Sequence, residues 1–117
     1  MDSFVRRLVE RLVAEGGALS RNRHFHTFET PEGRSALRIA RRLRALQRDV
    51  LRCRAEGGRV ELRRLPGAPA ARAVEVCLSH RVGTHRAFLH QEELDVLRAL
   101  PGLGEALGPA APARRVG

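Results

Sequence analysis

The sequence contains no lysine, tyrosine or tryptophan, and only one isoleucine and one asparagine. All 22 basic residues are therefore arginine. This bias is typical of a GC-rich genome, because arginine codons are GC-rich whereas lysine, asparagine, isoleucine and tyrosine codons are AT-rich. The choice of arginine over lysine is thus no evidence for bidentate phosphate recognition. The excess of basic residues, 22 against 13 acidic ones, remains informative, since aspartate and glutamate codons are equally available.

The sequence also lacks the features of membrane and secreted proteins. No run of about 18 apolar residues is present, which excludes a transmembrane helix. The amino terminus carries charges among its apolar positions, unlike a signal peptide. Two cysteines are too few for a disulfide framework and favour a reducing compartment. We therefore expect an intracellular protein, cytoplasmic or in the nucleoid or nucleus, with no membrane association.

Aromatic residues are scarce, with four phenylalanines as the only ones. The 117 residues suffice for one domain, which we place at residues 1–107, followed by a flexible tail at 108–117. A core this poor in aromatics is small. A homodimer, formed through the first helix or an edge strand, would bury additional area.

The first half of the chain predicts two helices with a short strand between them. An amphipathic helix is expected over residues 3–15, capped by Ser3, with core positions Phe4, Val5, Leu8, Val9, Leu12 and Val13. Residues 23–29 are short, aromatic and β-branched, as in a strand. Thr30 and Pro31 then begin a helix that runs to about residue 54 and stops at Gly57–Gly58.

Beyond the double glycine the hydrophobic period changes from 3.6 to 2. Alternating strands are expected around Val60–Leu62 and Val74–Leu78, separated by a loop at residues 66–69, with a third strand at 86–90. A helix at 91–100 ends at Pro101–Gly102, and residues 103–107 add a further turn. The predicted class is α+β, in the order α-β-α-β-β-β-α, with a mainly antiparallel sheet of three to four strands packed with two or three helices.

Arginines gather on one side of the second helix. At about 100° per residue, five of them fall within roughly 40° of one line, and we call these the arginine face: Arg34, Arg38, Arg41, Arg48 and Arg52. Arg42 and Arg44 flank them. The opposite side is apolar and is expected to pack on the sheet.

Asp49 is the only acid between Arg34 and Arg54. Arginines four residues apart repel each other by about 0.2–0.5 kcal/mol per pair. A chain that tolerates this repulsion is expected to meet a polyanion there, and nucleic acid is the commonest one. The alternatives are a solvated face in an arginine-rich chain, or a face paired with acids elsewhere. If Glu29, Glu61 and Glu75 lie beneath the arginine face, its charge is compensated.

Histidine and cysteine spacings do not indicate a metal site. His24 and His26 share one face of a strand, and Cys77 and His80 form a second candidate pair. Zinc needs four convergent ligands, whereas strand positions three apart point to opposite faces. No metal and no other cofactor is therefore expected.

Catalysis is not indicated either. No glycine-rich phosphate loop or nucleophile elbow is present, and Ser79 or Cys77 cannot normally reach His80 along the same strand. We therefore expect a protein that is not an enzyme.

Residues 59–107 show an arrangement of two alternating strands, a third ending in Ala87-Phe88-Leu89, and His90-Gln91-Glu92-Glu93-Leu94 opening a helix. This resembles the positive-cofactor family of transcriptional coactivators. The resemblance implies a curved sheet with a helix, dimerisation, and binding of single-stranded or melted DNA. Those families stack bases on sheet aromatics, whereas the strands here offer only Phe88, with His80, His85 and His90 as weaker surfaces.

These observations predict a small nucleic-acid-binding accessory protein in transcription or genome handling, with little sequence specificity. The alternative is a dimeric regulatory module whose arginine face docks an acidic protein partner. The expected phosphate contacts are Arg34, Arg38, Arg41, Arg42, Arg48 and Arg52, with Arg59, Arg63, Arg64, Arg81 and Arg86 on the sheet or its loops as helpers.

Overall fold

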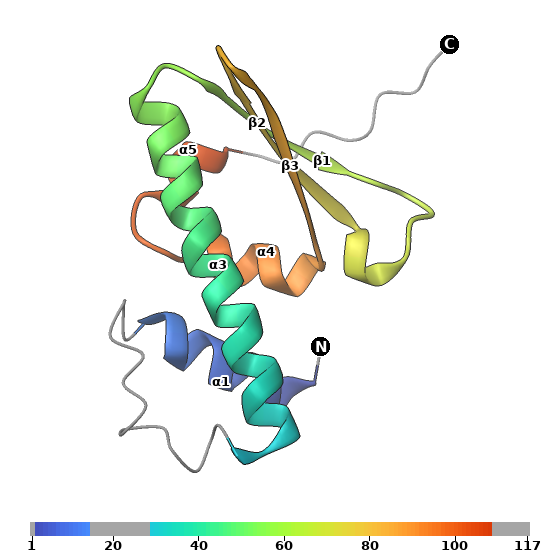
Figure 1. Ribbon diagram of the computed structural model, residues 1–117. Helices are drawn as coiled ribbons and strands as arrows, with labels where there is room; N and C mark the ends of the chain where they lie inside the picture. Colours follow the sequence, from blue (N-terminus) through green and yellow to red (C-terminus); the bar gives the residue numbers. More distant parts are fainter. Residues whose placement is uncertain (1, 15–28, 109–117) are drawn as a thin grey trace. The chain divides into compact units, whose positions relative to one another are not determined.

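The computed structural model describes residues 2–14 and 29–108 (Figure 1). The chain divides into two compact units, Met1–Leu46 and Gln47–Gly117, with the boundary inside helix α3. The α+β class is confirmed. The strand expected at residues 23–29 lies outside the described residues except for Glu29, so the described order is α-α-β-β-β-α-α. No helix in these ranges combines the length and apolar character needed to cross a membrane.

The first unit contains helix α1 (Ser3–Ala14) and the beginning of α3 (Pro31–Ala55). Asp2, one residue before the predicted cap Ser3, accepts a hydrogen bond from the Phe4 N–H at 2.7 Å. The expected apolar stripe is confirmed at four positions of α1, but the core assignment of Phe4 is wrong, because 56% of this residue is exposed. Among the described residues of this unit, the buried hydrophobic ones are Val5, Val9, Leu12, Val13, Ala36, Ala40, Leu43 and Leu46.

Helix α3 begins and ends as its sequence predicts. The Thr30 hydroxyl accepts a hydrogen bond from the Gly33 N–H at 3.0 Å, which satisfies one unpaired amide of the first turn. At the other end Gly57 adopts a left-handed conformation with φ of 77°. The Gly58 N–H then donates to the Cys53 carbonyl at 2.7 Å and closes the last turn.

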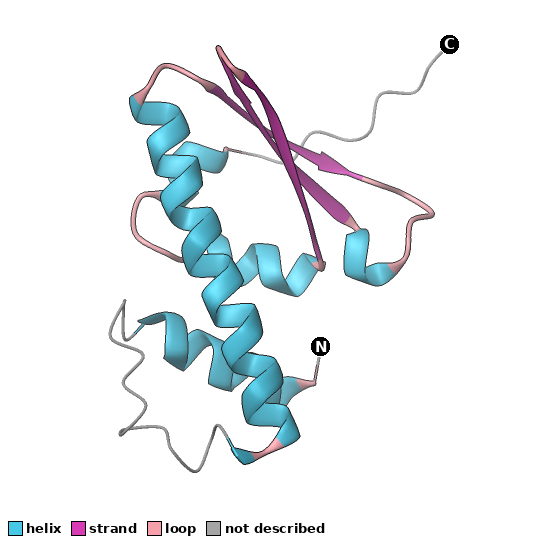
Figure 2. Ribbon diagram, viewed as in Figure 1, coloured by secondary structure: helices cyan, strands magenta, loops and turns pink. Residues whose placement is uncertain are grey.

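The second unit is built on a three-stranded antiparallel sheet in the order β1-β2-β3 (Figure 2). Its strands are β1 (Arg59–Arg64), β2 (Val74–His80) and β3 (Gly83–Leu89). A 3-10 turn, η1 (Ala70–Arg72), follows the predicted loop between β1 and β2. On one face of the sheet lie α4 (Gln91–Arg98), α5 (Leu103–Leu107) and the last turns of α3, and this is the inner face (Figure 1).

The inner face carries the apolar core of the second unit. The register aligns Val60 with Leu78, Leu62 with Val76, and Val74 with Leu89. These strand residues pack in the interior together with buried side chains of the helices: Val50, Cys53, Leu94, Leu97, Leu103 and Leu107. Gln47 is a buried polar residue of α3, and its amide donates to the Pro101 carbonyl at 3.3 Å.

The outer face of the central strand is less exposed than its alternating sequence suggests. Glu75 and Cys77 are both buried, at 8% and 7% exposure. They are flanked on β1 and β3 by long side chains that cover them, and Arg72 lies 4.1 Å from the centre of the Phe88 ring on the same side. Glu75 is therefore buried although it is charged, because flanking side chains cover a central strand from both sides.

The third strand ends one residue earlier than expected. His90 is not in β3 but caps α4: its Nδ1 accepts a hydrogen bond from the Glu92 N–H at 3.1 Å. The Glu93 carboxylate accepts one in return from the His90 N–H at 2.9 Å. This reciprocal pair is a capping box.

Of the expected tail, only Gly108 is described, and its carbonyl accepts a hydrogen bond from the Arg98 guanidinium at 2.9 Å.

Candidate nucleic-acid interface

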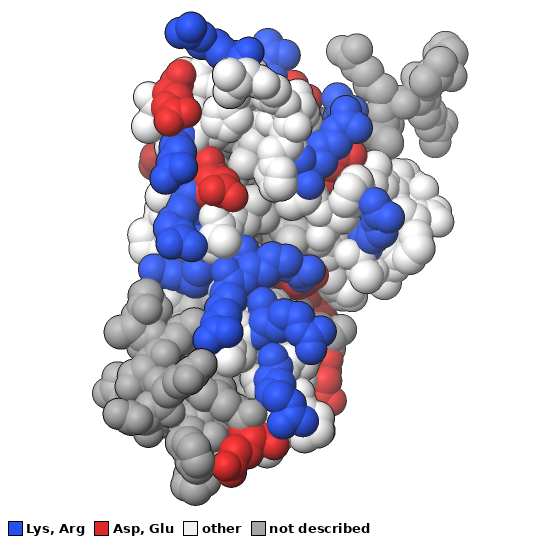
Figure 3. Space-filling model, viewed as in Figure 1, with Lys and Arg blue, Asp and Glu red and all other residues white. Residues whose placement is uncertain are grey.

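Helix α3 presents the arginine face to solvent in both units. In the first unit Arg34, Arg38 and Arg41 are exposed, and in the second unit Arg48 and Arg52 are exposed. Figure 3 shows basic side chains along α3 with few acidic ones among them. The helical period produces this arrangement, because the apolar positions of α3 are buried on its other side.

Most members of the arginine face have no acidic partner among the described residues. No carboxylate of residues 2–14 or 29–108 lies within ion-pair distance of Arg38, Arg41, Arg48 or Arg52. Arg34 donates to a backbone carbonyl, that of Glu29, at 3.0 Å. Its guanidinium is thus hydrogen-bonded, but no carboxylate in the described part of the chain pairs with its charge.

Arg42 differs from the members of the arginine face. Desolvation by partial burial lowers the pKa of its guanidinium from the ordinary value. Arginine remains protonated in proteins, so the guanidinium of Arg42 keeps its positive charge. Arg42 therefore contributes charge from the flank of α3.

The arginines of the sheet are placed differently, because they share the outer face with acids. Arg59 and Arg63 contact the Glu61 carboxylate at 3.5 and 3.3 Å, and Arg86 lies 3.7 Å from that of Glu75. Arg64 is exposed at the end of β1, and Arg81 is exposed in the turn between β2 and β3. Within the second unit, Glu61 and Glu75 thus lie on the face opposite to α3, and they compensate arginines of the sheet rather than those of the helix.

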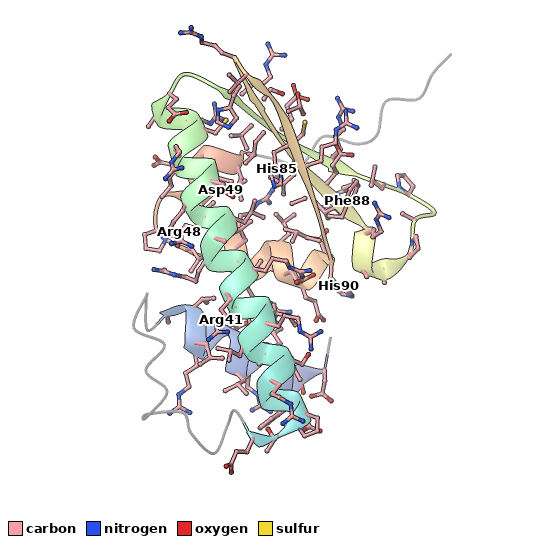
Figure 4. All side chains as sticks on the ribbon, viewed as in Figure 1. Arg41, Arg48, Asp49, His85, Phe88 and His90 are labelled. Atoms are coloured by element: carbon pink, nitrogen blue, oxygen red, sulfur yellow. The ribbon has the colours of Figure 1, made fainter. Side chains whose placement is uncertain are left out.

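A hollow with a volume of about 260 Å³ opens between the last turns of α3 and the inner face of β2 and β3. Its lining residues are Asp49, Arg52, Leu78, His80 and His85. Figure 4 shows Asp49 on the helix side and His85 on the strand side. The sequence analysis did not predict this hollow. The sequence feature that could have indicated it is the pair His80 and His85, which flank a tight turn and therefore lie on the same face of neighbouring strands.

The polar groups of the hollow are largely unpaired. Asp49 and His85 form no hydrogen bond or ion pair with other residues in the described part of the chain. His80 alone has a partner there, since its Nδ1 lies 3.7 Å from the Glu56 carboxylate. Leu78 adds an apolar floor that is 1% exposed. The hollow thus offers a carboxylate, two imidazoles and a guanidinium around an apolar base.

The metal candidates of the sequence are not brought together where they are described. His24 and His26 lie outside the described residues. Cys77 faces the outer side of β2, whereas His80 faces the inner side, as strand alternation requires. Cys53 is buried beside the carbonyl oxygens of Arg59 and Ser79, at 3.5 and 3.8 Å. Within 2–14 and 29–108 no three histidine, cysteine, aspartate or glutamate residues form a group suited to a metal ion.

Comparisons with protein-family models, with curated proteins and with solved structures find no match to this chain.

Proposed function

We propose that the protein binds nucleic acid through phosphate contacts made by the arginine face of α3. The single observation that carries this proposal is that Arg38, Arg41, Arg48 and Arg52 are exposed without a carboxylate within ion-pair distance among the described residues. Like charges at this spacing destabilise a helix unless a counter-charge arrives. Regularly spaced phosphates supply that counter-charge and release bound cations on binding.

The sheet acids do not compensate the charge of the arginine face in the second unit. Glu61 and Glu75 neutralise arginines of the outer face, so the charge of Arg48 and Arg52 in the same unit remains available. Phosphate contacts of this kind are independent of sequence. We also propose an accessory role in transcription or genome handling. The resemblance of residues 59–107 to the coactivator family supports this role.

The test compares two triple variants with the same change in net charge. In the first, Arg38, Arg41 and Arg48 of α3 become glutamine, and in the second, Arg59, Arg63 and Arg64 of β1 do. Fluorescence anisotropy with labelled single- and double-stranded oligonucleotides measures binding at several salt concentrations. We expect the wild type to bind with log K falling by about 0.9 per neutralised phosphate on duplex and about 0.7 on single strands per decade of salt.

The α3 triple variant should lose most of its affinity and show a shallower salt slope. The β1 triple variant should lose much less, since two of its arginines are already paired with Glu61. Equal losses in both variants would mean that net charge alone drives binding, and the arginine face would not be the site. A wild type that binds neither form at about 0.1 M salt would instead favour the acidic protein partner.

A further inference from the structure

We propose that the hollow lined by Asp49, Arg52, Leu78, His80 and His85 receives one unpaired guanine base of a bound nucleic-acid strand. This inference rests on the proposed function and adds a base preference to it. Two observations support the inference. The hollow has a volume of about 260 Å³, and the carboxylate of Asp49 and the imidazole of His85, on opposite sides of it, have no partner among the described residues. Sites for whole drug-sized ligands usually begin at about 300 Å³, so a smaller planar group is the better match.

The chemistry of the lining distinguishes the four bases. A carboxylate accepts hydrogen bonds through two neighbouring oxygens. Guanine is the base whose Watson–Crick edge presents two adjacent N–H donors, at N1 and N2. Adenine and cytosine present one amino donor beside an acceptor nitrogen, and thymine presents one N–H between two carbonyl oxygens. Asp49 would therefore attract guanine and repel part of the edge of the other three.

The other lining groups suit the rest of such a nucleotide. The imidazole of His85 offers a flat surface for stacking, as histidine does for splayed-out bases, and Leu78 excludes water from beneath the ring. The contact between His80 and Glu56 holds the second imidazole at the edge of the hollow. Arg52 belongs both to the hollow and to the arginine face, so a strand whose phosphates contact α3 passes directly beside the base site.

The experiment uses single-stranded oligonucleotides of about ten thymidines, a length within the usual site size. The central position is replaced by guanine, by adenine, or by inosine, which lacks the N2 amino group. With the wild type we expect the guanine oligonucleotide to bind about tenfold more tightly than the all-thymidine one, since a good bidentate contact discriminates by about 5- to 150-fold. Inosine should lose most of that preference.

Asp49→Asn should abolish the preference for guanine while leaving affinity for the all-thymidine oligonucleotide equal or slightly higher. Glu105→Gln, which makes the same charge change at an exposed position of α5 outside the hollow, should retain the preference. His85→Ala should weaken binding of the guanine oligonucleotide, and His85→Phe should restore it through stacking. Circular dichroism confirms that each variant is folded.

Two results overturn the inference while the proposed function survives: equal affinity of the wild type for the guanine and all-thymidine oligonucleotides, or an unchanged guanine preference in Asp49→Asn. If the wild type binds none of these single strands, the inference fails, and the proposed function fails with it only if labelled duplex is not bound either.

Discussion

Gly58 occupies a position that no larger residue can take without displacing its neighbours. A Cβ atom there would lie 2.6 Å from the Cys53 sulfur and 2.7 Å from the Ser79 carbonyl oxygen. The second contact is with backbone of the central strand, which cannot rotate away. The close approach of α3 to β2 therefore depends on this glycine.

We expect Gly58→Ala to lower the free energy of unfolding by about 1–3 kcal/mol, the usual cost of overpacking. Urea denaturation measures it. Gly104→Ala is the matched control, because its Cβ would meet only the Arg98 carbonyl at an ordinary 3.6 Å. That change lies within α5 and should leave stability unchanged or raise it by about 0.5–1 kcal/mol. An unfolding free energy of Gly58→Ala equal to that of the wild type would contradict the packing argument.

The sequence predicts the double glycine as a helix stop but not the different roles of its two members. Gly57 is needed for its positive φ, and a Cβ atom at this position would meet no described atom within 4 Å, whereas Gly58 is needed for space. Adjacent glycines carry the same local signal. Only the tertiary structure shows that Gly58, unlike Gly57, must be small, because it brings the Ser79 carbonyl, which is distant in sequence, next to Gly58.

At the scale of elements, the beginning of α4 depends on His90. Its imidazole and the Glu93 carboxylate together satisfy two backbone N–H groups that the helix leaves unpaired. Histidine is an unusual cap, and the sequence alone assigns it to the preceding strand. The helix is short, at eight residues, so its first turn is a large part of it.

We expect His90→Ala to lower the free energy of unfolding by about 1 kcal/mol, the typical cost of losing a helix cap. His90→Asp and His90→Asn keep a side-chain acceptor near the Glu92 N–H and should recover most of this loss. Thermal or urea unfolding followed by far-ultraviolet circular dichroism provides the measurement. If all three variants were equally destabilised, the imidazole would matter through packing rather than through capping.

Element boundaries and types follow from local pattern to a large extent, whereas the burial of the sheet does not. The alternation around Val74–Leu78 predicts β2 and the apolar identity of its inner face. It cannot show that Glu75 and Cys77 are covered, because this depends on Arg86 and Phe88 standing beside them in the register. The arginine face was predictable from the helical period, but the hollow beside it was not, since it requires α3 and the β2–β3 hairpin to meet.

At the scale of the whole molecule, we expect a homodimer. The core contains no tryptophan or tyrosine, and in the described part of the chain β1 and β3 each pair with β2 alone. Phe4 is one of three large apolar residues that remain exposed in that part. Burial between two copies would cover an unpaired strand edge or this apolar surface.

Light scattering at micromolar concentration should therefore give twice the mass of one chain. Phe4→Glu distinguishes the two interfaces: it should dissociate a dimer formed through α1 and leave a dimer formed through a strand edge intact. A wild type that scatters as a single chain would contradict the homodimer.

The placement of the two cysteines gives the molecule a property beyond binding. Both thiols are free and buried, Cys53 where the end of α3 meets the sheet and Cys77 at the middle of the opposite face. Because both thiols are buried, their reaction with a thiol reagent depends on local opening of the structure: the rate follows the population of the open state when reclosing is fast, and the opening rate when the reagent reacts faster than reclosing. The unaltered protein therefore carries two kinetic reporters, one for separation of helix from sheet and one for exposure of the central strand, and no introduced label is needed to follow either motion.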